Sequence, residues 1–185
     1  MTTTQVFIEL LITGFGTLAW IILIILGING FDFSFLLQEE MPSILLLPIT
    51  GLAYILGIIV DRIGFQIFKK KERKNIKKIF SEEDNNDSIK LKVVYIIQKS
   101  DHLKSAIDYN RSRLRLARSW IINFLMITVS LLLYCLVNLD KRPIVFLSLS
   151  IFSLIFCFLS FYTWSKLSSD YYKNIKSSYE SLKSL

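Results

Sequence analysis

The chain is poor in the residue types that build metal sites and catalytic centres. It contains a single histidine, His102, and two cysteines, and they form no cluster with the spacing of metal ligands. It also lacks a glycine-rich phosphate loop and a recognisable nucleophile motif. These absences predict a protein that is not an enzyme and that binds neither a metal ion nor an organic cofactor.

Charged residues are also scarce, at 20% of the 185 residues, whereas 52% are hydrophobic. The apolar residues gather in four long runs, at Val6–Ile28, Ile44–Phe68, Trp120–Val137 and Pro143–Trp164. About 20 helical residues suffice to cross the hydrocarbon core of a bilayer. The sequence therefore predicts an all-α integral membrane protein with four transmembrane helices.

Lysine and arginine are missing from the loop between the first two runs, and this absence predicts the orientation. The segment Lys69–Arg118 contains 15 of them and the tail after Trp164 contains four, whereas the turn between the last two runs has two. Because basic residues accumulate on the cytoplasmic side, both termini and the middle segment should face the cytoplasm. The first run carries Glu9 in place of a basic n-region, which favours an uncleaved anchor.

The net charge of +7 could indicate a protein that binds nucleic acid, but the lysine and arginine residues lie next to the spans. Positive-inside topology and anionic membrane lipid account for that placement, so we expect no direct binding of nucleic acid.

The segments divide the chain into four parts. Residues 1–69 hold the first two spans and residues 118–164 the last two. Residues 70–117 should form a basic cytoplasmic helical hairpin, and residues 165–185 a cytoplasmic amphipathic helix. The hairpin turns at the polar stretch 81–88. After this turn no proline or glycine occurs before the third span, which predicts one unbroken helix from Ile89 onward.

Apolar residues mark one face of each cytoplasmic helix. The face before the third span has spacings of three and four, at Val93, Ile96, Ser100, Leu103, Ile107, Asn110, Leu114, Ala117 and Ile121. A polar residue in such a seam, as Asn110 is, can fix register. The tail has a similar face, at Trp164, Leu167, Tyr171, Ile175, Tyr179 and Leu182. These faces predict a packed bundle; the alternative is a tail that lies on the membrane surface.

Four charged residues lie in or beside the spans at similar depth, near their cytoplasmic ends. Asp61 and Arg62 interrupt the second span, Glu9 lies in the first, and Arg118 precedes the third. Neighbours on a helix point about 100° apart, so Asp61 and Arg62 cannot simply neutralise each other. We predict the interhelical pairs Glu9–Arg62 and Asp61–Arg118. The alternative is that Arg62 extends to the headgroups while Asp61 pairs locally.

The second span has a side of small residues and an internal proline, at Pro48, Thr50, Gly51, Ala53 and Gly57. Small residues let helices approach closely in lipid. We expect Pro48, Gly51 and Gly57 to pack against other helices, with Gly14 and Gly16 of the first span, beside Thr13 and Thr17, as the receiving surface. The alternative is that the second span lines a pore.

A basic surface should lie directly beneath the bilayer. Its candidate residues are Lys70, Lys74, Arg111, Arg113 and Arg115. Because guanidinium groups bind carboxylates and phosphates with two parallel hydrogen bonds, this surface could hold a lipid headgroup, a nucleotide or an acidic partner, and we expect an acidic soluble protein to bind there. The alternative is a basic collar that contacts only lipid headgroups, with Trp120 as an interfacial anchor.

In its size, four spans, basic helical middle segment and internal termini, the chain resembles the small four-pass membrane subunits of bacterial anti-phage defence systems, such as the Kiwa membrane component. Its outline is also similar to the membrane accessory protein of some RNA-guided RNase systems. The resemblance implies an oligomeric inner-membrane protein that works with a cytoplasmic partner, and it carries over no functional residue. For the oligomer we predict a tetramer. The alternatives are a small channel or pore-forming effector, and an assembly factor of a membrane complex.

Overall fold

The fold consists of helices alone in the part of the chain that the computed structural model describes, residues 3–29, 43–80, 86–137 and 143–184. The helices are α1 (Thr3–Asn29), α3 (Ser43–Ile79), α4 (Asn86–Lys99), α5 (Asp101–Val137) and α6 (Pro143–Lys183). All of these except α4 are long and apolar enough to cross a membrane. The chain is an all-α, multi-pass membrane protein, as predicted. The acidic loop between the first two spans and the turn between the last two lie outside the described residues.

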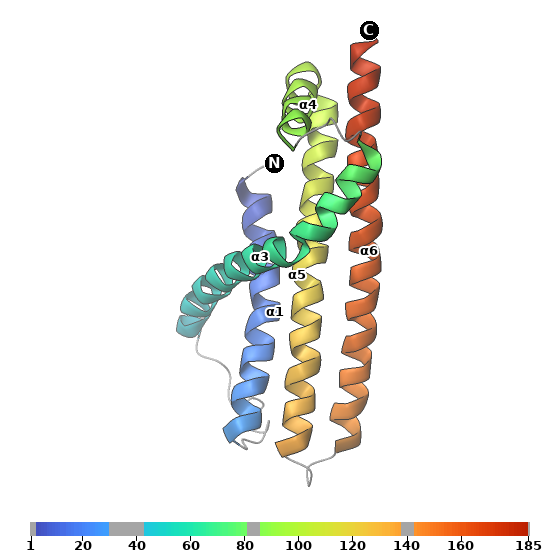
Figure 1. Ribbon diagram of the computed structural model, residues 1–185. Helices are drawn as coiled ribbons and strands as arrows, with labels where there is room; N and C mark the ends of the chain where they lie inside the picture. Colours follow the sequence, from blue (N-terminus) through green and yellow to red (C-terminus); the bar gives the residue numbers. More distant parts are fainter. Residues whose placement is uncertain (1–2, 30–42, 81–85, 138–142, 185) are drawn as a thin grey trace.

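Helices α1, α5 and α6 run side by side, and α3 crosses α1 and α5 obliquely on its way to α6 (Figure 1). The start of α1 and the end of α6 lie at the same end of the bundle (Figure 1). The lysine and arginine residues of α3 and of the first half of α5 lie toward this end, which we call the basic end. A strongly tilted helix needs a longer apolar segment to cross the bilayer, and the second apolar run is the longest of the four.

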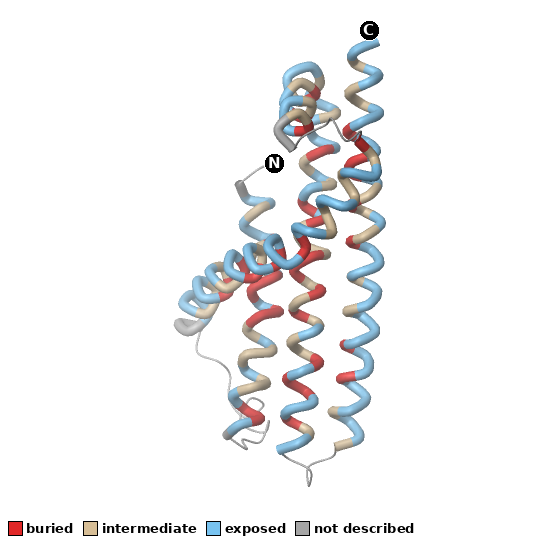
Figure 2. The backbone as a smooth tube through the Cα atoms, in the orientation of Figure 1, coloured by how far each residue is buried: buried red, intermediate tan, exposed pale blue. Residues whose placement is uncertain are grey.

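Burial in the spans is the reverse of that in a water-soluble protein. Many of the exposed side chains there are large and apolar, such as Leu47, Ile144 and Phe158. Thr17, Asn123 and Ser130 are almost completely buried, and buried positions gather where α1, α3 and α5 meet (Figure 2). In lipid, apolar side chains need no protein cover, whereas polar groups must find partners inside the protein.

Two glycines allow α1 and α3 to touch backbone to backbone. A Cβ atom on Gly14 would lie 1.6 Å from the carbonyl oxygen of Ala53, and one on Gly57 would lie 2.0 Å from that of Leu10. Gly57 is thus a close-packing position, and Gly14 receives α3 as expected. Such contact maximises dispersion between helices that no hydrophobic effect drives together in lipid.

Two further positions that we expected to pack do not do so against the described residues. No atom of the described residues lies within 4 Å of the place where a Cβ atom of Gly51 would be, and Pro48 is exposed. Both lie before Ala53, near the start of α3, where the helix stands away from the other helices (Figure 1). The small-residue side is therefore used only from Ala53 onward.

The prediction of one unbroken helix from Ile89 into the third span is wrong, because the chain turns at Ser100. Helix α4 ends at Lys99, α5 begins at Asp101, and the two run in different directions (Figure 1). The Leu103 amide donates to Ser100 Oγ over 3.4 Å, as at a helix N-cap, and Asp101 places a negative charge at the positive end of α5. Backbone bonds on both sides persist, from Ser100 to Ile96 and from Lys104 to Ser100.

We expect Ser100→Ala to loosen the junction between α4 and α5, because loss of an N-cap costs about 1 kcal/mol. Backbone amides at the start of α5 should then exchange about fivefold faster in hydrogen–deuterium exchange. Ser105→Ala is the matched control, because the Ser105 hydroxyl only donates to the Asp101 carbonyl within the same helix. Equal acceleration in both variants would contradict a capping role for Ser100.

The basic end is a packed bundle with its own apolar core. Residues of α3, α4, α5 and α6, together with Phe80 just after α3, form one buried cluster, comprising Phe68, Phe80, Ile89, Val93, Ile96, Ile107, Leu114, Ile121, Trp164, Tyr171, Tyr172 and Ile175. Both predicted apolar faces thus point inward, and Leu103, Leu167, Tyr179 and Leu182 pack at their margins. The tail packs on α5 and α4 as a continuation of α6.

Candidate functional site

Asp61 and Arg118 form an ion pair between α3 and α5, as the sequence predicts. An Arg118 guanidinium nitrogen lies 2.7 Å from Asp61 Oδ1, and the guanidinium also lies over the Phe65 ring, 5.4 Å from its centroid. Gly64 leaves room for the arginine stem, since a Cβ atom there would lie 3.2 Å from Arg118 Cγ. The Arg118 side chain is 10% exposed and that of Asp61 22%, so much of the pair is shielded from solvent.

Glu9 does not pair with Arg62, contrary to our prediction. It lies 2.8 Å from a guanidinium nitrogen of Arg115 and also accepts a hydrogen bond from the Ser112 hydroxyl. Arg62 is exposed, and the described residues place no carboxylate within ion-pair distance of it. The reason is helical rotation: α3 turns Asp61 toward α5, and the next residue then points away from the bundle.

The two ion pairs have a common organisation. Helix α5 contributes both arginines, at Arg115 and Arg118, and three residues of spacing place them on neighbouring positions of one face. Each arginine takes its carboxylate from a different helix, Glu9 from α1 and Asp61 from α3. We call these four residues the ion-pair cluster. Because it joins three helices, we expect it to fix the register of α1 and α3 on α5.

A second polar contact joins α1 and α5 deeper in the spans. The Asn123 amide donates to the Thr13 carbonyl over 2.8 Å, and the Thr17 hydroxyl lies 3.1 Å from both the Thr13 carbonyl and Asn123 Oδ1. Gly16 makes the contact possible, because a Cβ atom there would lie 2.6 Å from Asn123 Nδ2. These polar groups satisfy one another in hydrocarbon. Sequence reasoning missed Asn123, although a lone amide within an apolar run was the available signal.

The predicted docking residues do not all remain accessible. Arg111, Arg113, Lys70 and Lys74 are exposed, and the Arg113 guanidinium lies 5.4 Å from the centroid of the Tyr109 ring. Arg115 is half-buried and paired with Glu9, so it belongs to the ion-pair cluster rather than to the docking surface.

Polar contacts also connect α3 with α6 at the basic end. The Tyr172 hydroxyl donates to Glu72 over 2.8 Å, and Lys176 donates over 3.1 Å to the Ile79 carbonyl, where it caps the end of α3. Burial, and then the neighbouring Glu72 carboxylate, raise the pKa of Tyr172 above its ordinary value. The phenol therefore keeps its proton at neutral pH and remains a donor to Glu72.

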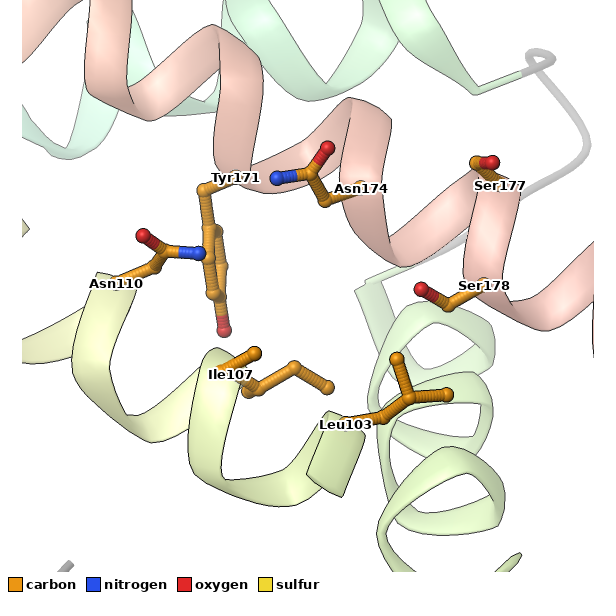
Figure 3. A pocket seen from close by; sticks show the side chains of 8 residues that line it. Leu103, Ile107, Asn110, Tyr171, Asn174, Ser177 and Ser178 are labelled. Atoms are coloured by element: carbon orange, nitrogen blue, oxygen red, sulfur yellow. The ribbon is translucent and has the colours of Figure 1, made fainter. Parts of the chain in front are cut away.

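A small pocket of about 170 Å³ opens between α5 and α6 near the basic end. Its polar lining includes Asn110 and Asn174, and the stick view shows the Asn110 amide beside the Tyr171 ring (Figure 3). Amide and hydroxyl groups alone give the pocket hydrogen bonds but no acid, base or nucleophile pair. Over the described ranges no three histidine, cysteine or acidic side chains come together to hold a metal ion.

Comparison of the chain with known protein families, curated proteins and solved structures finds no match in any of the three.

Proposed function

We propose that the chain is a membrane-anchored docking module of the bacterial inner membrane whose cytoplasmic bundle binds an acidic soluble protein. One observation supports this most: α3, α5 and α6 each continue from an apolar span into the packed bundle at the basic end without a break. A membrane anchor alone needs no such bundle. A rigid extension of three spans is suited to hold a partner at a fixed place beneath the bilayer.

The accessible charges of the bundle support an acidic partner. On α3, Lys70 and Lys74 are exposed, and Arg113 is exposed on α5. Carboxylates of a partner would meet these bases at the bundle surface, and attraction between exposed charges weakens when salt screens it. The excess of lysine and arginine on this side of the spans favours a cytoplasmic location for the bundle and for both termini.

The proposed module would also report on the membrane. The ion-pair cluster and the apolar core connect the spans with the bundle, and packed helices shift between discrete arrangements rather than deforming continuously. A role in anti-phage defence, and a homo-oligomer such as a tetramer, belong to this proposal through the resemblance in architecture. A small channel or an assembly factor would make less use of a basic bundle.

The test is affinity capture of the tagged protein at native expression. In the double variant Lys74→Glu/Arg113→Glu, we expect the affinity for the specific partner to fall about tenfold or more. Reversal of two contacting charges costs more than about 1.4 kcal/mol. Wild-type capture should also weaken as salt rises. Arg115 is left unchanged because it holds Glu9.

The matched control reverses two exposed lysines on α6, in Lys166→Glu/Lys183→Glu, and should keep the partner. Retention of the same partner by Lys74→Glu/Arg113→Glu, or equal loss of the partner in both double variants, would contradict a docking surface at Lys74 and Arg113.

A further inference from the structure

Arg62 is the arginine near the ion-pair cluster that meets no carboxylate among the described residues. Arg115 and Arg118 hold Glu9 and Asp61, whereas the Arg62 side chain is exposed on α3. It follows Asp61 directly and lies inside the apolar run that ends at Phe68. A guanidinium at this place is costly unless an anion or water reaches it.

The face of α3 that carries Arg62 is opposite the face that packs. The buried positions of α3 are Ala53, Gly57, Val60, Gly64 and Phe68. At about 100° per residue, Arg62 points roughly 160° away from Val60 and from Gly64. The face that carries Arg62 therefore points away from the helices on which α3 packs.

The outward face is apolar toward the middle of the span and becomes polar and basic toward its end. A phospholipid changes in the same order, from acyl chains to headgroup. Ile55 and Ile59 are exposed on the side toward the middle of the span. Arg62 follows, then Gln66 and Lys69, all of them exposed and each three or four residues from the last. Isoleucines match acyl chains, and the guanidinium matches a phosphate with two parallel hydrogen bonds. The Lys69 ammonium adds a second cation where the apolar run ends.

We infer that this outward face of α3, centred on Arg62 and Lys69, is a binding site for an anionic phospholipid of the leaflet at the basic end. A soluble protein does not fit the site as well, because Arg62 lies within the apolar run and is flanked by exposed isoleucines. The phosphate of a lipid lies at the depth that an arginine side chain reaches by extending toward the headgroups. The site is independent of the proposed soluble partner.

Purified protein in vesicles of equimolar phosphatidylglycerol and phosphatidylcholine tests the site, with bound lipids counted by native mass spectrometry. We expect wild-type protein to retain phosphatidylglycerol in preference to phosphatidylcholine. Arg62→Gln should lower this preference about fivefold, since a basic residue near an anionic surface contributes about 1 kcal/mol. Lys69→Gln should lower it as well, and Arg62→Lys should restore part of the loss.

Lys78→Gln is the matched control, because it removes one exposed charge from the same helix about 24 Å further along at ~1.5 Å per residue. It should leave the lipid preference unchanged. Equal preference in wild-type protein and Arg62→Gln, or an equal loss in Lys78→Gln, overturns the inference, since either result reduces Arg62 to one charge among many. If Arg62→Gln fails to insert into the membrane, the lipid preferences of Lys69→Gln and Lys78→Gln are compared instead. A loss in Lys69→Gln alone supports the site, and equal preferences overturn it.

Discussion

Gly14→Ala should separate α1 from α3 and destabilise the protein by more than about 3 kcal/mol, the upper end of ordinary overpacking. The added methyl group would lie 1.6 Å from the carbonyl oxygen of Ala53. A side chain could rotate out of the way, but this oxygen belongs to the backbone of a helix. The two helices must therefore move apart along the whole contact, which also strains the second close approach at Gly57.

The same substitution at Gly51 is the control, and it should act in the opposite direction. None of the described residues lies within 4 Å of a Cβ atom there, and alanine is favoured over glycine within a helix by about 0.5–1 kcal/mol. Thermal unfolding in mild detergent, followed by tryptophan fluorescence, should therefore rank Gly51→Ala at or above wild type and Gly14→Ala well below it. Equal midpoints for the two variants would show that the backbone contact is not maintained in the membrane protein.

Much of this architecture could be predicted because it depends on composition along one helix. The four spans follow from apolar length, and the inward faces of α5 and α6 follow from spacing at positions such as Ile107, Leu114, Trp164 and Ile175. Gly57 was recognisable as a close-contact residue because small residues have one main use in a lipid-embedded helix. These features require no knowledge of which helices are neighbours.

The rest depended on how helices are rotated and placed against one another. A sequence shows that Asp61 and Arg62 point apart, but not which of them faces the bundle. Glu9 pairs with Arg115 because α1 lies beside α5 at this depth. The sequence does not show which helices are neighbours. The break at Ser100 could not be predicted from the serine alone, because a serine can also lie within the apolar face of an unbroken helix. The Asp101 that follows was the neglected signal for a helix start.

Removing Asp61 from its ion pair with Arg118 should cost more stability than removing both partners. Breaking a buried pair costs about 3–5 kcal/mol. Because Asp61 keeps 22% of its side chain exposed, we expect about 2–3 kcal/mol for Asp61→Asn. Arg118→Gln should cost less, because Asp61 is the more exposed partner and water can reach a carboxylate left alone there.

The double variant Asp61→Asn/Arg118→Gln decides whether the pair acts as a unit. Arg118 Nε is already buried without a hydrogen-bond partner among the described residues, so an Arg118 that loses Asp61 has little compensation. Removing both charges abolishes this penalty, and the double variant should unfold at a higher temperature than Asp61→Asn alone. Arg73→Gln is the control on the same helix and should leave the unfolding temperature unchanged, since Arg73 is exposed and holds no carboxylate of the described residues. Strictly additive losses in the cycle would mean that Asp61 and Arg118 contribute independently, and α5 would then not fix the register of α3 through this contact.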